Sequence, residues 1–414
     1  MRVLCTILNP AGGRAGWGSP VEGRRAASVR HVKRIVFAMT GAEGLPGGIA
    51  RSNRNVLAAL ATLARAHDIP WSVQALLERP EHRPASLPED VPYHSHDGDR
   101  AGFSAALLAA WRPSALMVFD FVGIAAPVMP LALPGLARTV LFAHGRSYWR
   151  DVRKRDEWAI RSATLNLANS EWTLKKMREN LPPFRGEVCL LGLAPDFPLL
   201  AEPPRRTGEP VVLQSVDGVA RALGDRALLL VARMSAEEHE KGHYELLEVL
   251  PRVVAERPRT QMVFVGDGER LPELRDLARA RGLGECVFFT GRVDDETLNR
   301  LYRECYAFVM PSTQEGFGLV YLEAMNQAKA CLGCWDQGTE DVIVDGETGI
   351  LIRDPRNPEE LRAAIVRLLD DPARCARMGL RGFERVHAQF TSEIGQRRIV
   401  ERIEPLLDGH AGLP

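Results

Sequence analysis

From Lys33 onward, the chain alternates short aliphatic runs with longer segments in which apolar residues recur every three or four positions. Short apolar runs are typical of buried strands, and the longer spacing is typical of helices that bury one face. Their alternation predicts parallel sheets covered by helices. The clearest helix of the first half is 49–66, which places Val56, Leu60 and Leu63 on one stripe. The strands predicted there are RIVFAMT (34–40), WSVQALL (71–77), ALMVFDF (115–121), TVLFAHG (139–145), ATLNLANS (163–170) and EVCLLGLA (187–194).

A proline-rich segment separates this half from a second one. From residue 195 the sequence reads PDFPLLAEPPRRTGEPVV, and proline neither continues a helix nor fits a central strand. The strands predicted after it are ALLLVARM (227–234), QMVFVGDG (261–268), CVFFTGR (286–292) and YAFVMPS (306–312), and the helices are 242–256, 270–281, 294–304 and 318–328.

This order predicts an α/β protein with two Rossmann-like, doubly wound domains at residues 33–195 and 225–385, joined by a linker at 196–224. At 414 residues the chain is too long for one hydrophobic core, which agrees with two domains. Residues 386–414 have helical periodicity and are expected to form a C-terminal helix. Parallel α/β sheets bind ligands at the carboxyl ends of their strands, so two facing domains form one interdomain cleft.

The first 32 residues differ in composition from the rest. Residues 1–32 are rich in glycine and arginine and contain one acid, Glu22, so we expect a disordered extension. The alternative is a basic arm that contacts anionic lipid or nucleic acid. The apolar start MRVLCTIL is too short for a signal peptide.

Charge and cysteine usage indicate a cytoplasmic protein, with peripheral contact at the inner membrane face as an alternative. The 53 basic residues balance the 53 acidic ones, so net charge gives no argument for nucleic acid. The most apolar region, 114–137, contains Asp120 and three prolines, which argues against a membrane span. Scattered cysteines, odd in number, favour free thiols; they are Cys5, Cys189, Cys286, Cys305, Cys331, Cys334 and Cys375.

The segment STQEGFGLVYLEAM (312–325) joins a predicted strand to a predicted helix. Gly316 and Gly318 open the helix, so backbone N–H groups face the cleft and no side chain keeps a phosphate away. Glu315 precedes them and Glu323 follows, and carboxylates accept hydrogen bonds from neighbouring hydroxyls of a sugar or a ribose. The alternative is that Glu315 caps the helix and Glu323 lies on the surface.

Two cations occur at the same predicted sheet edge. Arg233 ends a strand, and Lys241 precedes the glycine that starts the next helix. An arginine binds two phosphate oxygens at once, and a lysine supplies a mobile point charge. Each alone is more simply a solvated surface residue, but together with Glu315 and Glu323 they predict a diphosphate-sugar site.

These motifs resemble those of retaining glycosyltransferases with the two-Rossmann GT-B fold, family 4 (glycosyl transferases group 1). The resemblance extends from 33 to 408 and is most specific from 226 to 352. The segments that carry it are LLLVARMSAEEHEKGHYELL, FVGDGERLPELRDLARARGL, VFFTGRV, AFVMPSTQEGFGLVYLEAM and EDVIVDGETGILI. One departure is WDQGTED, where Trp335 and a single glycine, Gly338, stand in place of the paired glycine of similar enzymes.

The resemblance implies a nucleotide-diphosphate sugar as donor, no cofactor, no metal, and an acceptor that is a glycan, a lipid-linked saccharide or a small molecule, as in polysaccharide biosynthesis. Arg233 and Lys241 would bind the diphosphate, Glu315 the donor sugar and Glu323 the ribose. Further donor contacts would come from the backbone, at Arg292 and Val293 beside the nucleobase and at Gly316, Phe317, Gly318 and Leu319 beside the sugar and phosphates.

The resemblance implies that the first domain would bind the acceptor. It also assigns roles in donor binding to residues of this domain. Gly47 and Gly48 open the first helix, so their amides would reach the diphosphate from the opposite side of the cleft. A lone Gly-Gly is otherwise more simply a turn. His144 ends the strand LFAHG, and similar enzymes have a histidine there that contacts the donor sugar. The C-terminal segment would return to this domain.

Three other motifs suggest different chemistry, and each has a simpler interpretation. Asp97-Gly98-Asp99 has the spacing of metal-dependent transferases but lies in a polar, proline-rich stretch, which favours a loop. Cys331 and Cys334 have zinc or redox spacing without a second cysteine pair, which favours buried thiols. The GDGE segment at 266–269 lacks the third glycine of a dinucleotide-binding loop.

Two other functions are considered on the same fold. A sugar-nucleotide epimerase would need acids and a base placed for elimination. A non-catalytic sugar-nucleotide-binding subunit is disfavoured because Arg233, Lys241, Glu315 and Glu323 are all present. The sequence contains no evident pair of carboxylates of the glycosidase type, so we expect the leaving diphosphate to take the acceptor's proton.

Overall fold

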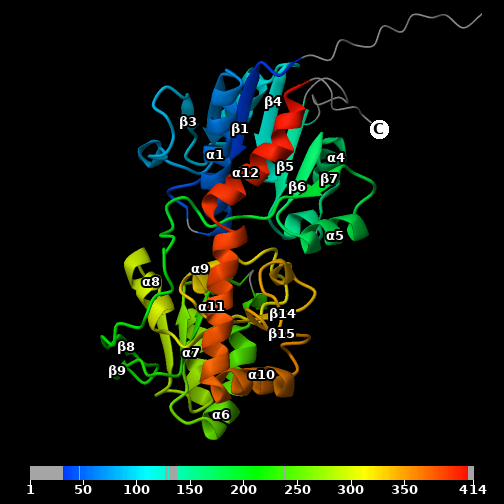
Figure 1. Cartoon of the computed structure of the whole chain (residues 1–414). Coiled ribbons are helices and arrows are strands. Elements are labelled where there is room, and N and C mark those ends of the chain that lie inside the picture. The colour runs from blue at the N-terminus through cyan, green and yellow to red at the C-terminus, as the bar shows by residue number, and fades with distance from the viewer. Residues whose placement is uncertain are drawn as a thin grey trace, which may run out of the picture.

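The computed structural model describes residues 31–45, 47–125, 129, 138–150, 152–236 and 239–408. Within them, two parallel sheets form separate layers of helices and strands, one above the other in Figure 1. The strand orders are β3-β2-β1-β4-β5-β6-β7 and β12-β11-β10-β13-β14-β15. In each sheet the chain starts in the middle, moves outward and then crosses to the other side. This confirms the predicted pair of doubly wound α/β domains and the GT-B arrangement.

The first sheet follows the predicted strands with two differences. The last strand stops at Val188, because Leu191 and Leu193 leave the sheet and pack in the core of the second domain. A short edge strand, β3, was not predicted, since Tyr93–Ser95 is brief and polar. The elements are β1 Arg34–Met39, α1 Gly48–Ala66, β2 Trp71–Ala75, β3 Tyr93–Ser95, α2 Arg100–Ala110, β4 Ala115–Phe119, α3 Val122–Ala125, β5 Arg138–Ala143, α4 Lys154–Ser162, β6 Leu165–Ala168, α5 Glu171–Asn180 and β7 Gly186–Val188.

The second sheet contains the four strands predicted above, somewhat shortened, and adds two more strands and two more helices. Its elements are β10 Ala227–Val231, α6 His243–Glu256, β11 Gln261–Val265, α7 Leu271–Ala280, β12 Val287–Gly291, α8 Asp295–Glu304, β13 Ala307–Val309, α9 Leu319–Asn326, β14 Cys331–Cys334, β15 Gly349–Ile352, α10 Pro358–Asp370 and α11 Pro372–Gln389.

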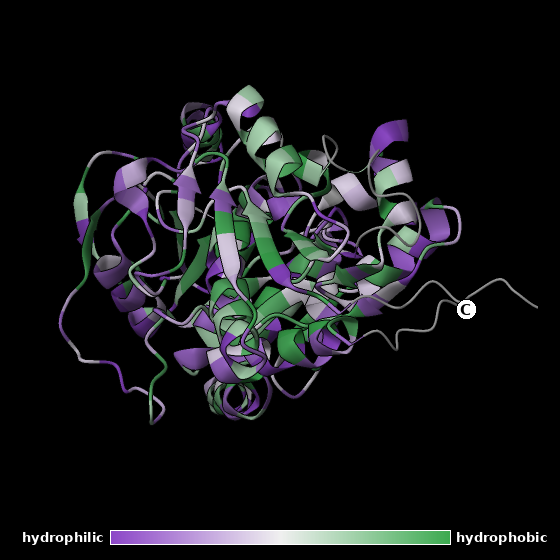
Figure 2. Cartoon of the chain, turned by 90° about the horizontal axis from the view of Figure 1, so that it is seen from above, coloured by the Kyte–Doolittle hydropathy of each residue, from purple (hydrophilic) through white to green (hydrophobic). Residues whose placement is uncertain are grey.

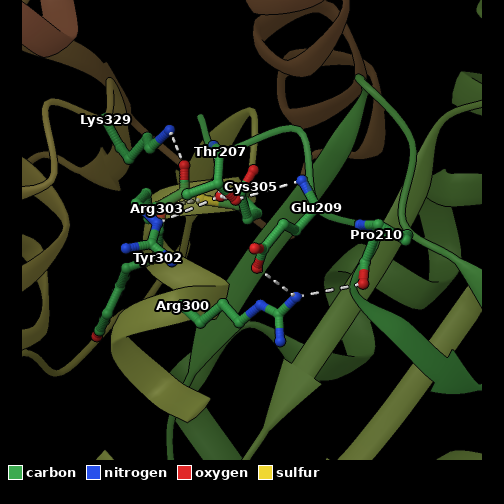
Figure 3. Close-up of polar contacts among 9 residues, drawn as sticks. Thr207, Glu209, Pro210, Arg300, Tyr302, Arg303, Cys305 and Lys329 are labelled. Atoms are coloured by element: carbon green, nitrogen blue, oxygen red, sulfur yellow. Dashed lines mark hydrogen bonds and ion pairs between the residues drawn. The ribbon is translucent and has the colours of Figure 1, made fainter. Parts of the chain in front are cut away.

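The segment predicted as a linker is partly ordered by α8. Thr207 donates from its backbone N and its hydroxyl to Glu304, at 3.0 and 2.9 Å, and Arg300 donates to Glu209 and to the carbonyl of Pro210 (Figure 3). The segment then forms an antiparallel hairpin of β8 Val212–Gln214 and β9 Ala220–Ala222. The interdomain connection is therefore fixed to the second domain over much of its length.

Hydrophobic residues gather in the central strands, and hydrophilic ones in the peripheral loops (Figure 2). In β1, alternate residues enter different clusters: Ile35 and Phe37 pack on the face covered by α1, and Val36 and Ala38 on the other. This period of two places a buried layer on both sides of the sheet.

The C-terminal segment returns to the first domain. After α11 the chain turns at Phe390, and α12 Ser392–Ile403 packs against α1, followed by a short 3-10 turn. The expected single helix from 386 is thus two helices, since Thr391 accepts a hydrogen bond from the Ile394 N and caps α12. None of the helices in the described ranges is long and apolar enough to cross a membrane.

Helix α11 approaches the turn between α9 and β14 so closely that a side chain at Gly379 would overlap the carbonyl oxygen of Ala328. We expect Gly379→Ala to lower the free energy of unfolding by about 1–3 kcal/mol, because the neighbouring backbone must move. Urea denaturation measures this change. Gly224→Ala is the control, since its Cβ would meet only the end of the Gln261 side chain. An unchanged stability of Gly379→Ala would show that α11 does not pack this closely on the turn after α9.

Candidate functional site

The start of α9 is the centre of the predicted site. Gly318 adopts the left-handed φ of +93° at the N-cap, and no side chain caps the helix. The first turn also contains no acidic residue. Free N–H groups and the helix dipole therefore make this end an attractive position for an anion.

Lys241 and Glu315 meet beside this helix start. Lys241 Nζ donates to Glu315 Oε2 at 2.8 Å, and both side chains are largely buried. Lys241 ends a 3-10 turn held against the loop after β13, where the Thr313 N donates to the Glu240 carbonyl at 2.9 Å. Gly242 follows at φ +90°, and a Cβ there would meet Pro311. The structure thus brings together two of the three charged groups on which the prediction depends.

Arg233 lies on the loop after β10, the strand that pairs with β13. It is exposed and at the same sheet edge as Glu315. Gly266 and Gly268, from the GDGE segment, support this loop: side chains there would overlap the carbonyls of Ala232 and Met234. Those glycines therefore allow close backbone packing beneath Arg233.

Glu323 lies one turn inside α9 and is 2% exposed, so its interpretation as a surface residue is wrong. Tyr302 Oη donates to Glu323 Oε2 at 2.9 Å, and the Arg51 guanidinium pairs with Oε1. Arg51 comes from α1 in the first domain. Burial raises the pKa of Tyr302, which therefore stays protonated and a donor at neutral pH.

The glycine loop of the first domain faces α9. Gly47 is the exposed N-cap of α1 at φ +113°, and a Cβ on Gly48 would lie 3.7 Å from Leu319 Cδ1. The loop is held by the buried carboxylate of Glu78, which accepts from the backbone N of Ala42, Glu43 and Gly44 at 2.6, 2.7 and 3.1 Å. The starts of α1 and α9 therefore lie on opposite sides of one domain boundary.

His144 lies where the loop after β13 meets the first domain. Its carbonyl oxygen is 3.0 Å from the Cβ position of Gly316 and accepts from Asn169 Nδ2 at 3.4 Å. Both ring nitrogens are buried with no hydrogen-bond partner in the described residues. Burial lowers the pKa of His144 to about 4, so the imidazole is neutral at neutral pH.

The first turn of α5 docks on the second domain. Thr173 Oγ1 donates to the Gly316 carbonyl at 3.3 Å, and the Glu171 N donates to Asp341 at 2.9 Å. Lys175 and Lys176 pair with Asp336 at 3.4 and 3.5 Å. Because residue 316 has no side chain, the first domain can contact its backbone. The sequence alone suggests only that this glycine lets a phosphate approach.

The departure at WDQG has a structural explanation. The Gly338 N donates to the Glu315 carbonyl at 2.8 Å, and a Cβ on Gly338 would overlap the carbonyl of Gly316. Gln337 accepts from the Glu315 N at 3.1 Å, while Trp335 is 37% exposed. A single glycine, Gly338, is therefore enough to let this loop pack against the backbone of Glu315 and Gly316.

The remaining predicted residues take the following positions. Arg292 is exposed and Val293 half-buried after β12, where Gly291 has φ +70°. Phe317 is buried and packs edge-on against Phe390, so only its backbone is available to a ligand. Leu319 is 9% exposed at the first position of α9.

The Asp97-Gly98-Asp99 segment and the pair Cys331 and Cys334 have structural roles. Asp99 accepts from the backbone N of Ala101 and Gly102, both at 3.0 Å, and caps α2. Cys331 and Cys334 are free thiols buried in β14. Neither motif contributes to the charged groups around α9.

Sequence reasoning missed Arg51 and Tyr302. Arg51 lies three residues after Gly48, in the first turn of a predicted helix, so its position beside the glycine loop was available from the sequence. Its partner was not, because the pairing depends on how the two domains sit together.

Residues 219–385 match the sequence model of a family described as glycosyl transferases group 1. The match spans the sheet and most of the helices of the second domain. The match includes Arg233, Lys241, Glu315 and Glu323. Together with the two-domain fold, the match shows a likeness to glycosyltransferases of the GT-B fold.

Similar proteins include other sugar transferases. Glycogen synthase from Mycobacterium tuberculosis is 27% identical over 295 residues, 68% of this chain and 66% of that protein. Alpha-D-kanosaminyltransferase from Streptomyces kanamyceticus is 35% identical over 157 residues, 38% of this chain and 40% of that protein. The chain therefore spans 66% or less of the length of these relatives.

Solved structures share the fold across both domains. HepE from Anabaena, in complex with UDP, has a TM-score of 0.66 and 17% identity, and the match covers 90% of this chain and all of that one. Sucrose-phosphate synthase from Thermosynechococcus elongatus has a TM-score of 0.67 and 21% identity, with 90% and 99% covered.

The protein should lose stability in mild acid. His144 and His243 are buried with pKa values lowered to about 4, whereas unfolded histidines have pKa values of about 6.5. Between these values the unfolded chain binds more protons, so the free energy of unfolding falls as the pH falls from about 6.5 to about 4. His144→Asn should lower the number of protons taken up on unfolding in this pH range by up to about one. Urea denaturation at several pH values tests it, and an unchanged slope in the variant would contradict the assignment.

Substitution of Gly316 should act on contact between the domains. In Gly316→Ala the new methyl group would meet His144 O at 3.0 Å and Asn169 Nδ2 at 3.4 Å, both in the first domain. We expect a larger radius of gyration by small-angle X-ray scattering, because separating the domains relieves the contact. Gly145→Ala, with open space at its Cβ, is the control. Identical scattering from Gly316→Ala and the unsubstituted protein would show that a small local shift relieves the contact and that the domains do not separate.

Proposed function

We propose that this chain is a retaining glycosyltransferase that moves a sugar from a nucleoside-diphosphate sugar to a hydroxyl group, without a metal ion. The acceptor would be a glycan, a lipid-linked saccharide or a small molecule. The observation that carries the proposal is the contact of 2.8 Å between Lys241 Nζ and Glu315 Oε2 beside the uncapped start of α9. A cation, a hydroxyl-binding carboxylate and free amides at one point suit a sugar joined to a diphosphate.

The similar proteins favour this class of donor. HepE was solved with UDP-glucose as well as with UDP, and other relatives are GDP-mannose-dependent mannosyltransferases. For this chain we assign the diphosphate to Arg233 and Lys241, the donor sugar to Glu315 and the ribose to Glu323. The backbone after Gly291 would border the nucleobase, and the amides of Gly47 and Gly48 would approach the phosphates from the first domain.

In the proposed reaction the donor's bond from the anomeric carbon to the diphosphate breaks, and the acceptor oxygen bonds to that carbon on the same face. The leaving diphosphate takes the acceptor's proton. Negative charge grows on the phosphate oxygens, so cations fixed there favour the transition state over the ground state. Contact between the domains would exclude water and limit hydrolysis of the donor. His144, neutral at neutral pH, would contact the donor sugar without adding a charge.

Removal of either cation should slow transfer strongly. We expect Lys241→Ala and Arg233→Ala to lower kcat on the order of a hundredfold, because each loses charge stabilisation at the leaving group. The donor is first chosen by a thermal-shift screen over UDP-, GDP- and ADP-sugars, since binding to the folded state raises Tm.

The control is Arg252→Ala, which removes an exposed cation paired with Glu359 on α10, away from α9. Full activity of either cation variant would refute the mechanism. Product analysis separates the alternatives: an epimerase changes the donor sugar without acceptor, and a binding subunit neither transfers nor hydrolyses it. Inversion at the anomeric carbon, seen by NMR, would refute retention.

A further inference from the structure

The contact between Arg51 and Glu323 joins the two domains through a buried carboxylate. Arg51 belongs to the first turn of α1, and Glu323 lies in α9; their side chains are 28% and 2% exposed. A buried carboxylate is costly unless it is paired and hydrogen-bonded. Tyr302, from the same domain, provides one hydrogen bond at 2.9 Å, and the first domain provides the cation. The second domain therefore depends on the first to compensate this charge.

The contact leaves part of the hydrogen-bonding capacity of Glu323 unused. An ionised carboxylate offers roughly four lone-pair positions, of which Arg51 and Tyr302 each take one. Two neighbouring ribose hydroxyls suit the positions that remain. Arg51 restricts the rotation of the carboxylate, so that these positions have a fixed direction.

The surroundings of Arg51 favour a nucleotide over a purely structural role. Arg51 lies one turn from Gly48, whose Cβ position is 3.7 Å from Leu319 at the start of α9. Neither helix start has a capping side chain or an acidic residue in its first turn. A guanidinium has five N–H donors, so Arg51 keeps donors beyond the one that binds Glu323.

We propose that Arg51 is a positioning residue through which the first domain controls recognition of the donor's ribose. It orients Glu323 when the domains are in contact, and this orientation is lost when they separate. The proposal rests on the donor site proposed above. Because Glu323 would bind both Arg51 and the ribose, donor affinity would depend on contact between the domains. The bound donor would in turn favour that contact.

The test compares a ribose nucleotide with one that lacks the ribose hydroxyls. Whichever of UDP, GDP and ADP binds most tightly is titrated beside its 2′,3′-dideoxy counterpart by calorimetry. The unsubstituted protein should prefer the ribose form by about tenfold or more, as expected for hydrogen bonds to a charged group. Arg51→Ala should reduce this preference below about threefold and raise the donor KM, with kcat changed less than KM. Arg51→Lys should restore part of it, since lysine keeps the charge without the planar fork.

Lys175→Ala is the matched control. It removes another cation that pairs across the same boundary, with Asp336 at 3.4 Å, and should keep the ribose preference. Glu323→Gln should lose it. A preference lost in Glu323→Gln but kept in Arg51→Ala would overturn the role of Arg51 and leave the donor site intact. A preference kept in Glu323→Gln, or absent from the unsubstituted protein, would also overturn it.

Two further outcomes keep the proposals separable. Failure of the unsubstituted protein to bind any of the three nucleotides would refute the proposed function itself. If Arg51→Ala does not fold, the double variant Arg51→Ala/Glu323→Gln removes the unpaired buried charge. Its nucleotide affinity should match that of Glu323→Gln alone, because both changes act through one carboxylate. A further loss that simply adds to that of Glu323→Gln would contradict the proposal.

Discussion

The arrangement of this molecule depends on the starts of α1 and α9 facing each other across the domain boundary. Both helices begin at a glycine without a capping side chain, and Gly48 lies against Leu319. Two uncapped helix starts repel each other weakly and leave N–H groups without protein partners. Such a boundary is more stable with an anion in it. The same geometry that costs stability in the unliganded protein therefore favours a diphosphate.

Ion pairs between the two domains offset the weak repulsion between the two helix starts. In the ion pairs described above, Arg51, Lys175 and Lys176 from the first domain meet carboxylates of the second. A further cation of the first domain, Arg150, pairs with Glu240 of the second, with 3.7 Å between Nη1 and Oε1. The exposed pairs contribute little individually, since solvent and salt screen them. The pair with Glu323 differs because the carboxylate is buried. The exposed pairs thus add a weak attraction between the domains, and the buried pair makes the contact specific.

The sequence predicted the fold and most of the positions around α9, because both depend on local patterns. Strand and helix periodicity located β10 and α9 to within a few residues, and glycine spacing located the loop between Glu315 and Leu319. The partners of these residues were less accessible. Arg51 is separated from Glu323 by 272 positions, and no local pattern predicts which residue of the first domain reaches that carboxylate. The strand predicted at 187–194 failed for the same reason, since Leu191 and Leu193 pack in the distant core.

Glycine in the segment 315–318 has more than one role, and this limits what its presence can indicate. A glycine before a helix is usually interpreted as room for a phosphate. Here Gly316 also admits His144 and Asn169 of the first domain, and Gly338 fits against its carbonyl from the opposite side. Three backbone segments thus converge where only one ligand contact was expected. A larger residue at 316 would disturb domain contact and donor binding together, so a loss of activity from such a substitution cannot by itself be assigned to the phosphate. Separating the two effects requires side chains that act on the domain contact alone, as Lys175 does through its pair with Asp336.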